Sequence, residues 1–230
     1  IRDRGKGETR PEDGKCVPDG CISSDYTPPK CEDFKPPSGG VGDNPDIGPK
    51  GKSYSLSSVE KGETNPTFTG GTLFVDKSGP TTSQTFSVKE VEGNAIDSNG
   101  NTVRFEGDFE GNGGLTFIGS DIGSESVLSG KNTYNGTTVV QEGILEITHV
   151  NGLGSTDAGT RVEKGAILRI SVDGESTPQG SPSNDAQINE KITLTGGELD
   201  LNGNYIDLRK GVVLEGKGVN STIRVKDSST

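Results

Sequence analysis

The sequence predicts an all-β protein built as a right-handed parallel β-helix, a solenoid in which each coil stacks on the previous one. Three observations predict this fold. Short segments of about five residues alternate apolar with polar side chains and end at Gly, Asn, Asp or Ser. One such unit recurs after 22 residues. Glycine supplies 36 of 230 residues while Met and Trp are absent, so the apolar content suits a narrow solenoid core better than a globule.

The first 52 residues differ from the rest of the chain. They are rich in proline, glycine and charge, and they show almost no apolar periodicity. This composition predicts an irregular leader over residues 1–52, followed by the β-helix domain over residues 53–230. Two interpretations of the leader stay open: a linker without a role of its own, or an exposed functional segment.

All three cysteines lie in this leader. Cys16 and Cys21 enclose the turn-forming VPDG and are the preferred disulfide pair; a Cys21–Cys31 bond and reduced thiols are the competing interpretations. A zinc site is disfavoured, because it needs four ligands and no histidine is near. A disulfide would indicate an oxidising, extracytoplasmic setting.

Alternating strands are predicted from Ser53 to Val225, in about seven coils. Asn99-Gly100 predicts a tight turn of the hairpin type between two of them. The strand segments are, in order, YSLSSV, GGTLFV, QTFSVKEV, NTVRFEGDF, GGLTFIG, TTVVQEGILEI, TRVEKGAILRI, KITLTGGELDLNG, YIDLRKGVVLEG and STIRV.

The repeat aligns most clearly between residues 140–145 and 162–167. Val140 matches Val162 and Leu145 matches Ile167, and the second copy then has one extra residue before Arg169, which predicts a bulge. A period in the low twenties is typical of one coil of three short strands, with glycine at the corners. Looser copies begin at Gly70, Gly113 and Gly196.

The segment LSGKNTYNGTTVVQEGILEI, residues 128–147, resembles the autotransporter-associated β-strand repeat of Gram-negative type V secreted proteins, also called the passenger-associated transport repeat. The family pattern is roughly LSG-x-NTY-x-G-x-T-x-V-x-x-G-x-L. The resemblance is specific over about 30 residues, diffuse over Ser53–Val225, and does not cover the leader. The matching residues are Leu128, Ser129, Gly130, Asn132, Thr133, Tyr134, Gly136, Thr138, Val140, Gly143 and Leu145.

This resemblance implies a passenger domain that is secreted or displayed on the bacterial surface, with its own C-terminal β-barrel translocator outside this chain. We expect a monomeric, non-catalytic protein that binds a host cell-surface receptor or matrix component. It would act as an adhesin or as a released ligand of the angiogenic-factor type. The alternatives are a polysaccharide-acting β-helix enzyme and a purely structural spacer.

Catalytic signals are weak. The one histidine, His149, ends a strand, and no serine lies in a GxSxG or GDSG context, so no serine-protease triad is predicted. We interpret the alternating carboxylates as solvated strand faces, and we expect no cofactor or metal. The acidic groups considered are Glu106, Asp108 and Glu110, and the pair Asp200 and Asp207.

The net charge of −11 argues against partners that are polyanions, namely nucleic acid and anionic membranes. Recognition is expected in loops that leave the solenoid. The longest candidate binding loop is Val172–Asn189, which is polar and contains proline, and residues 75–85 form a second one. Named candidates in the first loop are Val172, Asp173, Glu175, Pro178 and Asn189.

Overall fold

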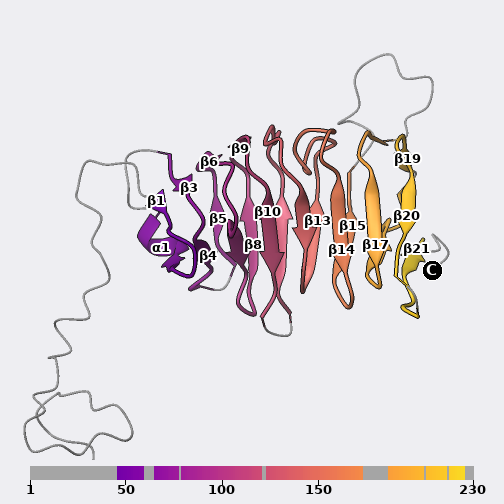
Figure 1. The fold of residues 1–230 in the computed structure, drawn as a ribbon, viewed down its shortest axis with the longest axis horizontal. Coiled ribbons are helices and arrows are strands. Elements are labelled where there is room, and N and C mark those ends of the chain that lie inside the picture. Colours follow the sequence, from indigo (N-terminus) through magenta and orange to yellow (C-terminus); the bar gives the residue numbers. More distant parts are fainter. Residues whose placement is uncertain are drawn as a thin grey trace, which may run out of the picture. The chain divides into compact units, whose positions relative to one another are not determined.

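The chain divides into two units, Ile1–Val41 and Gly42–Thr230, and every residue described below belongs to the second. In this unit the strands stack coil upon coil as a parallel solenoid (Figure 1). The predicted all-β parallel solenoid is therefore confirmed, and its right-handedness stays a prediction. The computed structural model describes residues 46–59, 65–77, 79–120, 123–172, 186–204, 206–216 and 218–225.

Each coil crosses up to three sheets in chain order, called here faces 1, 2 and 3. Face 1 holds β1 (Asp46–Ile47), β3 (Thr67–Phe68), β6 (Phe86–Val88) and β9 (Phe109–Gly111), and later the pair β16 (Ala186–Ile188) and β19 (Ile206–Leu208). Face 2 holds β2 (Ser53–Ser55), β4 (Thr72–Phe74), β7 (Ala95–Asp97), β10 (Leu115–Ile118), β12 (Thr138–Val140), β14 (Thr160–Glu163), β17 (Ile192–Thr195) and β20 (Val212–Leu214). Face 3 holds β5 (Thr81–Thr82), β8 (Thr102–Phe105), β11 (Glu125–Leu128), β13 (Ile144–Ile147), β15 (Ile167–Ile170), β18 (Glu198–Asp200) and β21 (Thr222–Arg224).

Every pair of neighbouring strands is parallel among the residues that the structure describes. Coils are numbered 1 to 8 by their face 2 strand, from β2 to β20. Eight strands on face 2 correspond to about seven turns of the chain, as the sequence predicts.

The solenoid begins earlier than the predicted boundary at Ser53. Strand β1 pairs with β3, and its Ile47 is fully buried. A single apolar residue between prolines and glycines gives no alternating pattern, so the sequence could not indicate this strand. Helix α1 (Leu56–Val59) follows β2 and buries Leu56 and Val59. In coil 1 it takes the place in chain order that the face 3 strand β5 has in coil 2.

The core consists of apolar columns that run from coil to coil. On face 2, parallel register places one inward residue of each coil from coil 2 to coil 7 above the next, and each of these is at most 2% exposed. This column explains the alternation in the sequence, because every second residue of a strand points inward. Its members are Leu73, Ile96, Phe117, Val140, Val162 and Leu194.

Phenylalanine fills the core of coils 2 to 4. The rings of Phe86 and Phe109 stack with centroids 5.0 Å apart, and Phe105 packs edge-on to Phe109 at 5.3 Å. Phe68 lies 5.9 Å from Phe86. Such ring pairs add to the stabilisation from area burial, so this aromatic stack joins faces 1 and 3 in the N-terminal coils.

The Asn99-Gly100 turn is confirmed, but its interpretation as a hairpin is wrong. Both residues have positive φ, 49° and 75°. The flanking strands do not pair with each other: β7 pairs with β4 and β10 on face 2, and β8 with β5 and β11 on face 3. The same tight turn thus forms a coil corner between two parallel sheets.

The register of the repeat is confirmed at its start and wrong at its end. Val140 pairs with Val162, as predicted, but Leu145 pairs with Leu168 rather than Ile167. The extra residue is the buried Ala166, located at the corner before the strand. The looser copies also fall on different faces: Gly71 and Gly114 precede face 2 strands, while Gly197 precedes the face 3 strand β18.

Candidate functional site

Face 1 changes its construction between β9 and β16. The two segments that cross it there, in coils 5 and 6, are described but form no strand. They still stack through backbone bonds: Thr133 N donates to Phe109 O, Asn135 N donates to Gly111 O and Ser155 N donates to Tyr134 O, each at 2.8 Å. Buried side chains add to this backbone support.

Asn132 provides part of this support. Its side chain is buried; Oδ1 accepts from Phe109 N at 2.8 Å, and Nδ2 donates to Gly152 O at 2.6 Å. One amide group thus joins coils 4, 5 and 6. This role explains asparagine at the first position of the NTY motif, because no apolar residue could satisfy both a buried donor and a buried acceptor.

Tyr134 and Thr138 form a second buried polar link. Their hydroxyl oxygens lie 2.6 Å apart, and Thr138 Oγ1 donates to Leu153 O at 3.2 Å. Thr138 pairs in register with Thr160 in the next coil. Thr160 Oγ1 in turn donates to Glu190 Oε1 at 3.1 Å. The interior of coils 5 to 7 is therefore partly polar, and this polar part reaches a carboxyl group.

Glu190 is the most unusual ionisable residue of this region. It is 3% exposed and stands two residues before β17, where Gly136 and Ala158 stand before β12 and β14. Burial raises the pKa of its carboxyl to about 7, and the charge of Asp157 acts in the same direction. The hydrogen bond from Thr160 and the charge of Lys210 lower this pKa but only partly offset burial.

The Glu190 hollow, as we name it, is a cavity of about 380 Å³ on face 1. Its lining combines an apolar part (Val150, Leu153 and Gly154) with side-chain amides, one carboxyl and one guanidinium. Asp207 holds that guanidinium at 2.7 Å from its Oδ2 to Arg209 Nε. The polar lining residues are Asn151, Thr156, Gln187, Asn189, Glu190 and Arg209.

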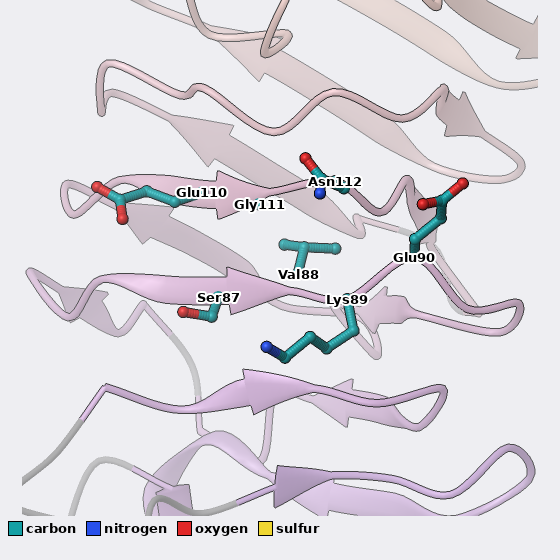
Figure 2. Close-up of a pocket in the computed structure, with 7 residues that line it drawn as sticks. All are labelled: Ser87, Val88, Lys89, Glu90, Glu110, Gly111 and Asn112. Carbon is teal, nitrogen blue, oxygen red and sulfur yellow. The ribbon is translucent and has the colours of Figure 1, made fainter.

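A second hollow of about 410 Å³ lies between β6 and β9, also on face 1 (Figure 2). Figure 2 shows the carboxylates of Glu90 and Glu110 at opposite ends of it. Its charged residues, Lys89, Glu90 and Glu110, are all exposed. This second hollow is similar in size to the Glu190 hollow but has no buried charged group in its lining, which makes it a natural comparison. Ser87, Val88, Gly111 and Asn112 complete the lining.

A charge cluster lies on face 3. Arg169 is 2.7 Å from Glu125, 3.6 Å from Glu146 and 3.2 Å from Asp200, measured between nitrogen and carboxylate oxygen. Burial and the neighbouring Glu146 raise the pKa of Glu125, while Arg169 opposes that shift. The three carboxylates surround one cation on successive strands, which is the geometry of an ion-pair network joining coils 4 to 7.

The predicted acidic groups are not brought together as a site. Asp200 contacts Arg169 on face 3, whereas Asp207 pairs with Arg209 on face 1. Glu106 and Glu110 are exposed, and Asp108 Oδ1 accepts from Lys131 N at 2.7 Å. The exposed Glu106 and Glu110 fit the interpretation as solvated strand faces, whereas Asp200 is buried within the Arg169 network.

His149 has a local role in a turn. Its Nδ1 accepts from Asn151 N at 3.0 Å. Burial lowers the pKa of His149, as does the charge of Lys131. The structure therefore agrees with a strand-end histidine. Within the described ranges, no cluster of three or more potential metal ligands occurs.

The candidate binding loop is shorter than predicted. Val172 is 1% exposed and belongs to the core, and residues 186–188 form β16 of the solenoid body. Asn189 is exposed and lines the Glu190 hollow. The second predicted loop also belongs partly to the body, because Val75 is fully buried and β5 pairs with β8. Asp173, Glu175, Pro178, Cys16, Cys21 and Cys31 lie outside the described residues.

Sequence reasoning identified one residue of the Glu190 hollow, Asn189, and missed Glu190, Asn151 and Arg209. The available signal was a glutamate at a position where the preceding coils carry glycine or alanine. That signal required the correct coil register, which a single sequence with insertions did not provide.

The chain matches no protein-family model, and searches of curated proteins and of solved structures found no similar protein. The resemblance to the passenger repeat therefore rests on the motif residues themselves. None of the described helices is long and apolar enough to cross a membrane.

Proposed function

We propose that this chain is a secreted or surface-displayed autotransporter passenger that binds a host cell-surface or matrix component without catalysing a reaction. One observation carries the proposal: the motif residues that resemble the passenger repeat have specialised roles in the solenoid. Asn132 satisfies backbone groups of two other coils, and Tyr134 and Thr138 form the buried hydroxyl link. These roles support the proposal, because they are the roles expected of a repeat motif whose copies stack coil upon coil.

Binding is favoured over a purely structural role by the Glu190 hollow. A spacer needs only repeated apolar columns and solvated faces. Here a buried glutamate lines a cavity together with residues that carry side-chain amides and a guanidinium, which is the composition of a recognition site.

Polysaccharide cleavage is the second candidate, favoured by the raised pKa values of Glu190 and Glu125. Glycoside hydrolysis generally requires two carboxyl groups on either side of the scissile bond. Among the residues that line the Glu190 hollow, only Glu190 carries one. The carboxylates near Glu125 are held by Arg169, on a face where neither hollow lies. The geometry therefore favours binding over cleavage.

The test uses the full chain, purified and fluorescently labelled. We expect saturable binding to cultured host cells or to immobilised matrix proteins, competed by unlabelled chain. Absence of binding to both would contradict the proposal and favour the spacer. Release of reducing ends from a polysaccharide panel would instead favour the enzyme.

A further inference from the structure

We propose that the Glu190 hollow binds a neutral, hydroxyl-rich sugar residue of a glycan. This inference rests on the proposed binding function and names the ligand class for one site on the solenoid.

The lining has the groups that recognise a sugar. Each sugar hydroxyl both donates and accepts hydrogen bonds, and the side chains of Asn151 and Asn189 offer both functions as well. The carboxyl of Glu190 can accept, and the guanidinium of Arg209 can donate. Val150 and Leu153 provide an apolar surface for the C–H face of a ring. A mixed lining of this kind is typical of small-molecule sites in which a few polar groups fix the orientation.

The carboxyl group is held from inside the solenoid. Thr160 Oγ1 donates to Glu190 at 3.1 Å, and the 3% exposure of Glu190 leaves little room for other conformations. Burying a carboxyl at the position that Gly136 and Ala158 occupy in the two preceding coils opposes folding. A residue that lowers the stability of the fold and lies at the wall of a cavity is a candidate for a functional role rather than a stabilising one.

The local charges favour a neutral ligand. Glu190 and Asp157 are acidic, and Asp207 already pairs with Arg209 at 2.7 Å. Lys210 Nζ donates to Thr156 O. Because Arg209 and Lys210 are engaged in these contacts and the chain carries a net charge of −11, an anionic sugar would gain little attraction here.

The size of the site is also compatible. A volume of about 380 Å³ lies at the lower end of the range of small-molecule sites, roughly 300–1,000 Å³. A single sugar residue or a short end of a glycan suits this volume better than a folded protein surface does. The glycan would thus be recognised at one residue, with the rest of it along face 1.

The test measures binding of the full chain to immobilised oligosaccharides, some neutral and some sialylated or sulfated. We expect binding to a subset of neutral glycans. Asn189→Ala and Arg209→Ala should each weaken it about tenfold, since each removes hydrogen bonds to the ligand. Glu190→Gln, which keeps the shape of the side chain, should weaken it by a similar factor.

The matched control is Asn112→Ala in the second hollow (Figure 2), which should leave glycan binding unchanged. Circular dichroism and the unfolding midpoint establish that each variant is folded. Equal affinity of the wild type and all three Glu190 hollow variants would overturn the inference, as would binding confined to sialylated or sulfated glycans.

A cell experiment separates this inference from the proposed function. Periodate oxidation of the cell surface, under conditions that cleave the vicinal diols of neutral sugars, should abolish binding of the wild type. Binding that survives oxidation would retain the proposed function and overturn the glycan site. Binding to neutral oligosaccharides without binding to cells or matrix would retain the site and overturn the host-binding proposal.

Discussion

Coils 2 to 4 and coils 5 to 6 support face 1 in two different ways. In coils 2 to 4, strands β3, β6 and β9 pair in parallel above a stack of phenylalanine rings. In coils 5 and 6 the chain crosses the same face without a strand, and Asn132 and Tyr134 hold it by buried hydrogen bonds. The backbone path is similar, but strand pairing and an aromatic stack maintain it in one region, whereas buried side-chain hydrogen bonds are added to the apolar packing in the other.

This difference has a functional consequence. Both regions have a hollow of similar size on face 1, but the one beside Leu153 and Gly154 is lined by the buried Glu190, whereas the one between β6 and β9 has no buried charged group in its lining. The buried hydroxyls of Tyr134 and Thr138 also make the interior more polar towards coil 7, where Glu190 stands. The hydrogen-bonded region is thus the part of the solenoid that can accommodate a buried carboxyl.

The largest expected effect tests the aromatic region. Phe109→Ala removes a fully buried ring that contacts Phe68, Phe86 and Phe105. We expect the free energy of unfolding to fall by about 3–5 kcal/mol, measured by urea denaturation. Phe74→Ala, at a half-buried ring on β4, is the control and should cost clearly less. Equal costs would refute the packing role assigned to the stack.

The second prediction tests the hydrogen-bonded region. Asn132→Ala leaves Phe109 N and Gly152 O without their side-chain partner inside the protein. We expect a loss of about 2–4 kcal/mol, because each buried unsatisfied group costs about 1–3 kcal/mol. Asn135→Ala removes an exposed bond to Asn112 and should change stability by less than about 0.5 kcal/mol. If the two variants unfold at the same urea concentration, the proposed support of face 1 is wrong.

The third prediction concerns the sign of a pH effect. The pKa of Glu190 is about 7 in the folded chain against 4.5 for an unperturbed glutamate, so the folded state binds the proton more tightly. The stabilisation that proton binding by Glu190 contributes is therefore fully present below pH 4.5 and is lost as the pH rises to 7. Glu190→Gln removes this dependence and should stabilise the chain at pH 8 by up to about 3 kcal/mol.

The measurement for Glu190 is urea denaturation of wild type and variant at pH 4 and at pH 8. The difference between them should vanish at pH 4, where both side chains are neutral. Glu110→Gln, at an exposed position in the second hollow, is the control and should show little difference at either pH. A destabilised Glu190→Gln at pH 8 would contradict the cost assigned to the buried charge.

The smallest expected effects compare two corners within the hydrogen-bonded region. Gly143 and Gly165 have φ of 74° and 84°, where a β-branched residue is strained. Gly165→Val should cost about 1–2 kcal/mol, since nothing lies within 4 Å of an added Cβ. Gly143→Val should cost more, because its Cβ would lie 3.0 Å from Gly119 Cα and Ser124 O. A reversed order of thermal midpoints would contradict these corner geometries.

Much of the fold could be predicted because alternation and glycine corners are local. Each strand needs only a few inward apolar residues, so columns such as Val140 and Val162 could be read from the chain. The start of the solenoid could not, since β1 presents only Ile47 as a buried residue. The ends of the predicted Val172–Asn189 loop were also misplaced, because β16 is only three residues long and its partner β19 lies about 20 residues later.

By itself, the sequence determined the solenoid class, the repeat, and the motif residues that needed an explanation, because these depend on periods of two and of about 22 residues. Only the tertiary structure decided what the motif residues do and where the candidate site lies. Asn132 spans three coils, and the Glu190 hollow combines residues from Val150 to Arg209. Such sites depend on which residues of successive coils lie next to each other. Insertions change the spacing between these residues in the sequence, so only the three-dimensional structure reveals the register.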